Sequence, residues 1–157
     1  MDVAIREASI NDLKTVQDMN YRLFLHDKKS DPTLDDKWPY SKAGLDYFTR
    51  MLSGAKNICL IAENEKKEPV GYVIGRFEAV HKPRPNVREA ELDNIIVLET
   101  YRDKGVGTAL VDHLVLWAKS KKATHIKVTG YSKNKHALEF YQRRGFLPFT
   151  TTFEMEL

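Results

Sequence analysis

The sequence predicts an α/β protein whose central sheet is mixed, mostly antiparallel and flanked by helices. Three strand-like segments, 57–63, 70–79 and 88–97, follow one another over short connections, which favours antiparallel pairing. The last of them is followed by a helical pattern and then by the alternating segment 124–129, so these two strands are expected to be parallel. A chain of 157 residues, 42% of them hydrophobic, suffices for one domain with a buried core, and we assign residues 1–157 to it.

A strand at residues 3–6 and a long helix are expected first. Ser9 and Asp12 stand at the spacing of a capping box, with Asp in place of the usual Glu or Gln. Apolar residues then recur at helical spacing up to about residues 26–29, and this apolar face is interrupted only at Asn20. The pattern indicates an amphipathic helix that flanks the sheet.

The next segments alternate between loops and regular elements. Two prolines and several acidic residues predict a loop over residues 31–40. Ser41 is expected to cap a second helix that ends near Gly54. The charged residues 64–68 then form the turn between the first two strands of the central group.

The C-terminal half begins with a loop at 81–86, before the long strand. The helix after that strand is expected to run to about Lys121. Asn134 begins a further short helix, which Gly145 closes as the residue after its last turn. Two closing strands are predicted at 146–149 and 151–156.

The stretch from Tyr101 to Leu110 joins a buried strand to an apolar-periodic helix and contains two glycines. Glycine permits positive φ and lets a ligand approach the backbone closely. The first N–H groups of a helix lack internal partners and carry partial positive charge, so those of residues 104–108 can cradle a phosphate. Ordinary packing at the start of a helix would also explain the glycines. The P-loop motif is absent, and the dinucleotide motif fails because Leu110 stands where its third glycine belongs.

Composition and charge exclude several classes of protein. The net charge of +3 is too small to indicate a nucleic-acid partner. From Tyr101 to Leu157 there are ten Lys or Arg against five Asp or Glu, which suits a polyanionic cofactor, although solvated helix faces have the same composition. No apolar run approaches the ~18–20 residues of a membrane span. The first residues do not resemble a signal peptide, so a cytoplasmic protein without membrane contact is expected.

Neither a disulfide nor a metal site is expected. The only cysteine, Cys59, lies in an apolar stretch and is expected to pack in the core. The five histidines show no metal-binding spacing; they are His26, His81, His113, His125 and His136.

Three motifs in order resemble the GNAT superfamily of N-acetyltransferases. They span Glu91 to Phe146, and the elements before them also fit. The motifs are Glu91-Leu92-x-x-Ile95-x-Val97, Arg102-x-x-Gly105-x-Gly107 and Asn134-x-x-Ala137-x-x-Phe140-Tyr141-x-x-x-Gly145-Phe146. The resemblance implies the GNAT fold, in which the parallel strands 88–97 and 124–129 splay apart and acetyl-CoA enters the gap.

The resemblance also implies which residues hold acetyl-CoA. Three strand residues would bind the pantetheine arm through their backbone, although their side chains also suit simple core packing. The glycine-containing turn would bind the pyrophosphate, and the last helix would contribute further contacts. The expected cofactor-binding residues are Ile95, Ile96, Val97, Arg102, Asp103, Lys104, Gly105, Val106, Gly107, Thr108, Asn134, Ala137 and Tyr141.

Four residues are candidates for the chemistry. Tyr141 matches the tyrosine that serves GNAT members as general acid, and its ordinary pKa of ~10 suits donation to a thiolate of pKa ~8.5, although an aromatic residue at helical spacing also suits simple core packing. The backbone N–H of Val97 would stabilise the oxyanion. Glu91 and Asp93 share one face of their strand, where family members often place a base or a water-relaying carboxylate. Two solvated carboxylates would look the same in the sequence.

The sequence therefore predicts an acetyl-CoA-dependent N-acetyltransferase that acts on a primary amine, most simply that of a small molecule. The alternatives are acetylation of a protein N-terminus or lysine, and a non-catalytic acyl-CoA-binding regulator. A homodimer is compatible with the resemblance. Two loops are expected on the acceptor side, where carboxylates with aromatic residues suit a cation. A solvated acidic loop would have the same composition. The loops carry Asp31, Asp35, Asp36, Trp38 and Tyr40, and Pro83 and Pro85.

Overall fold

The computed structural model describes residues 3–78 and 83–157. A five-stranded sheet in the order β1-β2-β3-β4-β5 forms its centre, and only the β4–β5 pair is parallel. The strands are β1 (Ala4–Glu7), β2 (Asn57–Glu63), β3 (Pro69–Glu78), β4 (Glu89–Val97) and β5 (His125–Val128). The helices are α1 (Leu13–Asp27), α2 (Lys42–Ser53), α3 (Val106–Ser120) and α4 (Lys135–Arg143). The mixed, mostly antiparallel sheet expected from the sequence is confirmed.

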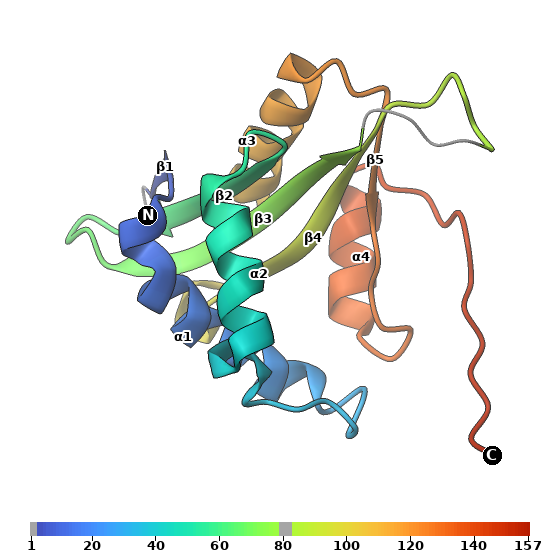
Figure 1. The fold of residues 1–157 in the computed structure, drawn as a ribbon, viewed down its shortest axis with the longest axis horizontal. Coiled ribbons are helices and arrows are strands. Elements are labelled where there is room, and N and C mark those ends of the chain that lie inside the picture. The colour runs from blue at the N-terminus through green and yellow to red at the C-terminus, as the bar shows by residue number, and fades with distance from the viewer. Residues whose placement is uncertain (1–2, 79–82) are drawn as a thin grey trace.

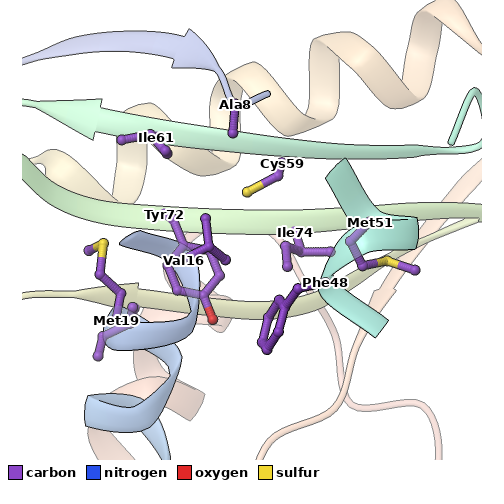
Figure 2. Close-up of a cluster of buried hydrophobic side chains, with 10 residues drawn as sticks. Ala8, Val16, Met19, Phe48, Met51, Cys59, Ile61, Tyr72 and Ile74 are labelled. Carbon is purple, nitrogen blue, oxygen red and sulfur yellow. The ribbon is translucent and has the colours of Figure 1, made fainter. Parts of the chain in front are cut away.

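The helices cover both faces of the sheet (Figure 1). On one face, α1 and α2 bury a core that contains Val16, Phe48 and Tyr72 (Figure 2). On the other face, α3 packs Leu110 and Leu114 against β2, β3 and β4. Because β2 and β3 are covered on both sides, their residues read as continuous apolar runs instead of an alternation.

The parallel pair β4–β5 separates before β4 ends. Pairing with β5 covers Glu89 to Leu92 only, whereas β4 remains paired with β3 as far as Val97. The last five residues of β4 therefore have one backbone edge without a strand beside it among the described residues. This is the splay between the two parallel strands that the resemblance to the GNAT superfamily implied.

The structure explains the polar interruption in the apolar face of α1. Asn20 is 2% exposed, and its Nδ2 donates a hydrogen bond of 2.7 Å to the hydroxyl of Tyr72. Tyr72 donates in turn to Oδ1 of Asn94 over 2.5 Å. The polar position thus belongs to a buried network that joins α1 to β3 and β4. The capping box at Ser9 and Asp12 is also present, ahead of a short 3-10 turn.

The closing strands predicted at 146–149 and 151–156 are wrong. Residues 146–157 pair with no described strand, and the segment runs away from the body of the protein (Figure 1). Alternating apolar residues favour a strand only where a partner edge is aligned with them, and Pro148 has no N–H to donate. Phe153, 91% exposed, remains in solvent. The predicted strand end at Ala79 and the start of the 81–86 loop lie outside the described residues.

Candidate active site

A cleft of about 540 Å³ occupies the gap between β4 and β5. Residues from five parts of the chain line it: the end of α1, the end of β4, the turn before α3, the segment after β5, and α4. The turn and α4 lie on the α3 face of the sheet, whereas α1 packs on the opposite face. The cleft therefore passes through the plane of the sheet at the splay, so that one ligand can approach from each face.

The turn before α3 presents a row of unused backbone donors. The N–H groups of residues 103–108 form no hydrogen bond with any described residue. Gly105 has φ +85°, a left-handed conformation that glycine adopts without strain, and a Cβ built there meets no atom within 4 Å. Unpaired N–H groups at the start of a 15-residue helix form a site for anionic oxygens.

Each of the two cations of the turn makes a specific contact. Nε of Arg102 donates to the carbonyl oxygen of Val97 over 3.0 Å, which ties the turn to the end of β4. Nζ of Lys104 donates to the carbonyl oxygen of Thr100 over 2.7 Å. Arg102 therefore fixes the shape of the cleft as well as its charge.

Gly107 keeps the cleft open between three elements. A Cβ at this position would lie 3.3 Å from Cζ of Phe140 and 3.7 Å from Cγ2 of Val97. A larger side chain here would fill the space between α3, α4 and the end of β4. Glycine is favoured at position 107 because α4 and the end of β4 approach the backbone closely, and not because the backbone takes an unusual conformation.

The end of β4 directs N–H groups into the gap. The N–H of Leu98 bonds to the carbonyl of Val70 on β3 over 2.9 Å. Hydrogen-bonded and non-bonded pairs alternate along antiparallel strands, so Ile95 and Val97 turn their N–H groups away from β3 and toward the gap. Ile96 turns toward β3, and its side chain is buried in the core under α1.

Tyr141 stands in the wall of the cleft with a free hydroxyl. Its side chain packs with Phe140 and Phe146, and the hydroxyl forms no hydrogen bond with a described residue. Burial, and to a lesser extent the charge of Asp27, raises the pKa of Tyr141 to about 12. The phenol thus keeps its proton throughout the physiological pH range and acts as a donor.

The N-terminus of α4 completes the cleft opposite the turn. Oδ1 of Asn134 accepts from the N–H of Ala137 over 3.2 Å, so Asn134 caps the helix as its position predicted. Nε2 of His136 lies 3.3 Å from Oδ1 of Asp103 and joins α4 to the turn. His136 was not expected near the cleft, because nothing in the sequence around it indicates a contact with a residue more than thirty positions away.

The two carboxylates of β4 occupy different environments. Asp93 lines the cleft, whereas Glu91 does not. Both pair with Nη2 of Arg76 at 2.8 Å, and the hydroxyl of Tyr47 donates to Oδ2 of Asp93. Burial, followed by the charge of Asp93, raises the pKa of Tyr47, which therefore remains a donor. Asp93 is thus fixed in position at the cleft, whereas Glu91 lies outside the cleft.

The loop at 31–40 does not line the cleft. Trp38 packs against aromatic residues of α1 and α2, and the hydroxyl of Tyr40 donates to Asp18 over 2.7 Å. Asp36 pairs with Lys28 at 3.0 Å. The aromatic residues expected to meet a cationic acceptor are thus used to hold the loop on α1 and α2.

The end of α1 enters the cleft instead, which sequence reasoning missed. Leu23, His26 and Asp27 all line it. Burial raises the pKa of Asp27 to about 6 and lowers that of His26. The helical spacing shows that these residues share one end of α1, but only the contact of α1 with β4 brings that end to the splay.

Two further features bound the chemistry. Cys59 is buried under α1 and α2, and burial raises the pKa of its thiol to about 12. Within residues 3–78 and 83–157, no group of three His, Cys, Asp or Glu residues could hold a metal ion. No helix in the same part of the chain is long and apolar enough to cross a membrane.

Known proteins with similar sequences are acetyltransferases. Residues 20–146 match the family described as Acetyltransferase (GNAT) family. The chain is 37% identical over 113 residues to an uncharacterised N-acetyltransferase of Methanocaldococcus jannaschii, covering 71% of this chain and 49% of that protein. It is 28% identical over 113 residues to acetyl transferase GW6a of Oryza sativa subsp. japonica, covering 66% and 27%. The chain thus spans about half or less of these relatives' own length.

Solved structures share the fold over the whole chain. The BH1408 protein of Bacillus halodurans has a TM-score of 0.81 at 20% identity, covering 98% of this chain and 99% of that one. AAC(6')-Iy, in complex with a bisubstrate analog of CoA and acetylneamine, has a TM-score of 0.77 at 16% identity, covering 100% and 99%. At these identities the likeness concerns the fold. Since the family match covers most of the sequence and the fold agrees with it, the chain belongs to the Acetyltransferase (GNAT) family.

Proposed function

We propose that this protein transfers the acetyl group of acetyl-CoA to the primary amine of a small molecule, by direct attack of the amine on the thioester. The observation that carries the proposal is the row of unused N–H groups at residues 103–108, because four residues of this row, Asp103, Gly105, Gly107 and Thr108, line the same cleft as Tyr141, whereas Lys104 and Val106 do not. The solved neighbour AAC(6')-Iy, bound to a CoA-linked analog of an acetylated amine, supports this reading of the cleft.

The residues of the cleft fit acetyl-CoA in chemistry and in space. The unused N–H groups and the open space at Gly105 suit a pyrophosphate, with Arg102 and Lys104 beside them. The N–H of Ile95 suits an amide carbonyl of the pantetheine arm, whereas that of Val97 is left for the thioester oxygen. Asn134 and Ala137, which are expected to contact the cofactor, line the opposite wall of the cleft. When bound, acetyl-CoA supplies an acetyl group activated as a thioester.

The chain's own groups then assist the transfer. The N–H of Val97 donates to the carbonyl oxygen as negative charge develops on it, the function of an oxyanion hole. Tyr141 holds the proton that the departing sulfur requires. An alkyl ammonium has a pKa of ~10.4, so the nitrogen must lose a proton before it can attack, and a carboxylate near the amine helps. Asp93 lies at the cleft, where Arg76 and Tyr47 already bond to its oxygens and hold it in the wall beside the amine.

The dimensions of the cleft favour a small acceptor. Its whole volume of about 540 Å³ lies within the range of ~300–1,000 Å³ typical of small-molecule sites, and acetyl-CoA would occupy part of it, so only the remainder is left for the acceptor. Carboxylates at its acceptor end suit an amine that arrives as an ammonium ion. A protein N-terminus or lysine would present the same ammonium group, so the experiment must compare both kinds of acceptor.

The proposal is tested by mixing the purified protein with acetyl-CoA and a panel of amines, and by following the release of free thiol. The panel contains aminoglycosides, polyamines, simple alkyl amines and peptides with free N-termini or lysines. We expect amine-dependent thiol release that is fastest with a small-molecule amine. Faster release with peptides would make this a peptide acetyltransferase. Tight acetyl-CoA binding without thiol release from any amine would contradict an enzymatic function and indicate a regulator.

A further inference from the structure

Asp27 differs from the other carboxylates near the cleft because no described residue neutralises it. Its side chain forms neither a hydrogen bond nor an ion pair within residues 3–78 and 83–157, although it lines the cleft. Asp93, in contrast, accepts from Tyr47 and Asn94 and pairs with Arg76. Asp31 accepts from the backbone and side chain of Thr33. Asp27 is thus a carboxylate with its hydrogen-bonding capacity unused.

The position of Asp27 places it on the acceptor side. It ends α1, which packs on the face of the sheet opposite α3 and the phosphate-binding turn. A ligand that enters between the turn and α4 therefore meets Asp27 only after it has passed the splay. The apolar side chains of Leu23 and Ile96 line the cleft beside it and can contact an aliphatic chain.

The surroundings of Asp27 make it a stronger base than an ordinary carboxylate. Burial raises the pKa of Asp27 to about 6. The negative charge of Asp27 in turn contributes to the raised pKa values of three phenols, those of Tyr72 on β3, Tyr131 after β5 and Tyr141 on α4. On α1 itself, His26 next to it has a pKa lowered by burial and then by Arg102 and Lys29, so that it is neutral. Among the remaining charged groups of the cleft, Asp93 and Asp103 are acidic and Arg102, Arg143 and Arg144 are basic, and His136 contacts Asp103. A half-buried carboxylate without a partner is unfavourable, and a bound cation removes that cost.

We propose that Asp27 is the acceptor-binding carboxylate, which pairs with the ammonium group of a primary alkyl amine and takes up the proton that its nitrogen loses during acetyl transfer. This inference rests on the proposed acetyltransferase function. In the step, the nitrogen–carbon bond forms and the carbon–sulfur bond breaks. The proton of the nitrogen passes to a carboxylate oxygen of Asp27, and the thiolate takes the proton of Tyr141. Asp93, fully bonded, holds the wall of the site.

The strength of the base supports this assignment. General bases work best when their pKa lies near the working pH. With a pKa of about 6, Asp27 is still ionised at pH 7 and accepts a proton more readily than an ordinary Asp of pKa ~3.9. In wild type, kcat/KM for the acceptor should therefore fall as the pH decreases through about 6, because the base becomes protonated.

The test compares Asp27→Asn, which keeps the shape and removes the charge, with Asp46→Asn, which makes the same change on the exposed side of α2. Acceptor kcat/KM is measured from pH 5 to 9, and acetyl-CoA affinity is measured by calorimetry. In Asp27→Asn, we expect kcat/KM to fall ~10²–10⁴-fold and the decline near pH 6 to disappear, with acetyl-CoA affinity unchanged. Asp46→Asn should behave as wild type. Wild-type kcat/KM and pH dependence in Asp27→Asn would overturn the proposal.

A binding measurement separates this inference from the function on which it rests. The carboxyl carbon of Asp27 is followed by NMR during a titration with the best acceptor of the panel or, if none is acetylated, with 1,4-diaminobutane. We expect the amine to lower the pKa of Asp27 and to lose affinity at least tenfold in Asp27→Asn. Such binding without turnover would contradict the acetyltransferase function alone. Amine binding that does not depend on Asp27, or no amine binding, would overturn the role of Asp27.

Discussion

At the scale of single residues, the polar side chains of the cleft fall into two kinds: those held by bonds to other residues and those left free of any described partner. Asp93 is held by Arg76 and Tyr47, so its position is fixed before any ligand binds. The hydroxyl of Tyr141 and the carboxylate of Asp27 have no partner among the described residues. Groups that the protein leaves free in a cleft are available to reactants, whereas held groups shape the site around them.

The role of Tyr141 is tested by Tyr141→Phe, which keeps the ring and removes the proton. The ring packs with Phe140 and Phe146, so the fold and the affinity for acetyl-CoA should be retained. We expect kcat to fall ~10²–10⁴-fold, the usual effect of losing a general acid. Wild-type kcat in the Phe variant would show that Tyr141 only packs.

At the scale of elements, the turn before α3 lines the cleft with unused N–H groups. Gly107→Glu would place a larger, negatively charged side chain between Phe140 and Val97. We expect acetyl-CoA affinity to fall at least ~100-fold, because the carboxylate repels the phosphates and fills their space. Leu116→Glu is the matched control, since Leu116 is 63% exposed on the same helix. Equal acetyl-CoA affinity in both variants by calorimetry would remove the turn from the binding site.

Sequence patterns predicted the elements better than their long-range partners. The glycine turn, the cap at Asn134 and the parallel pair were all visible as local patterns. Contacts between residues far apart in the sequence were not visible in this way. Trp38, for example, stands in a polar loop yet packs against α1 and α2. In the same way, the alternation after Gly145 predicted strands, but a strand also requires an aligned partner edge, which no local pattern reports.

The same limit explains which site residues were predicted. Motif positions such as Tyr141 and Gly107 could be identified, because their spacing within one or two elements fixes their position. Asp27 could not, because it meets the cleft only where the end of α1 lies beside the end of β4. In the sequence, Asp93 stands nearer the splay whereas Glu91 matches the motif, and the extent of the splay brings only Asp93 to the cleft.

At the scale of the whole molecule, Asp27 links stability to pH. The pKa of Asp27 rises from 3.8 when unfolded to about 6 when folded, so the folded protein binds more protons between these values and its stability falls as the pH rises from about 4 to 6. The Asp27→Asn variant has no carboxyl group at this position, so it does not lose stability in this way as the pH rises. In urea unfolding, we expect the variant to gain ~1–2 kcal/mol over wild type between pH 4 and pH 7, after allowance for solvent screening.

The control for this stability effect is Asp46→Asn, whose carboxylate is exposed. Between pH 4 and pH 7, Asp27→Asn should gain more stability over wild type than this control does. The same gain in both variants would mean that burial does not perturb the carboxyl of Asp27. A variant that gains stability while losing activity would show that the unpaired carboxylate is retained for the reaction and not for the fold.

The central claim is that acetyl passes directly from the thioester to an amine within one cleft. Within the described residues, the only cysteine is buried in the core under α1 and α2, away from the cleft. The most direct measurement mixes stoichiometric protein and acetyl-CoA in a rapid-quench instrument, with and without the best amine acceptor, and quantifies free thiol and acetylated protein by mass spectrometry. We predict thiol release only when the amine is present, in step with the formation of acetylated amine. A burst of thiol and acetylated protein without the amine would contradict it.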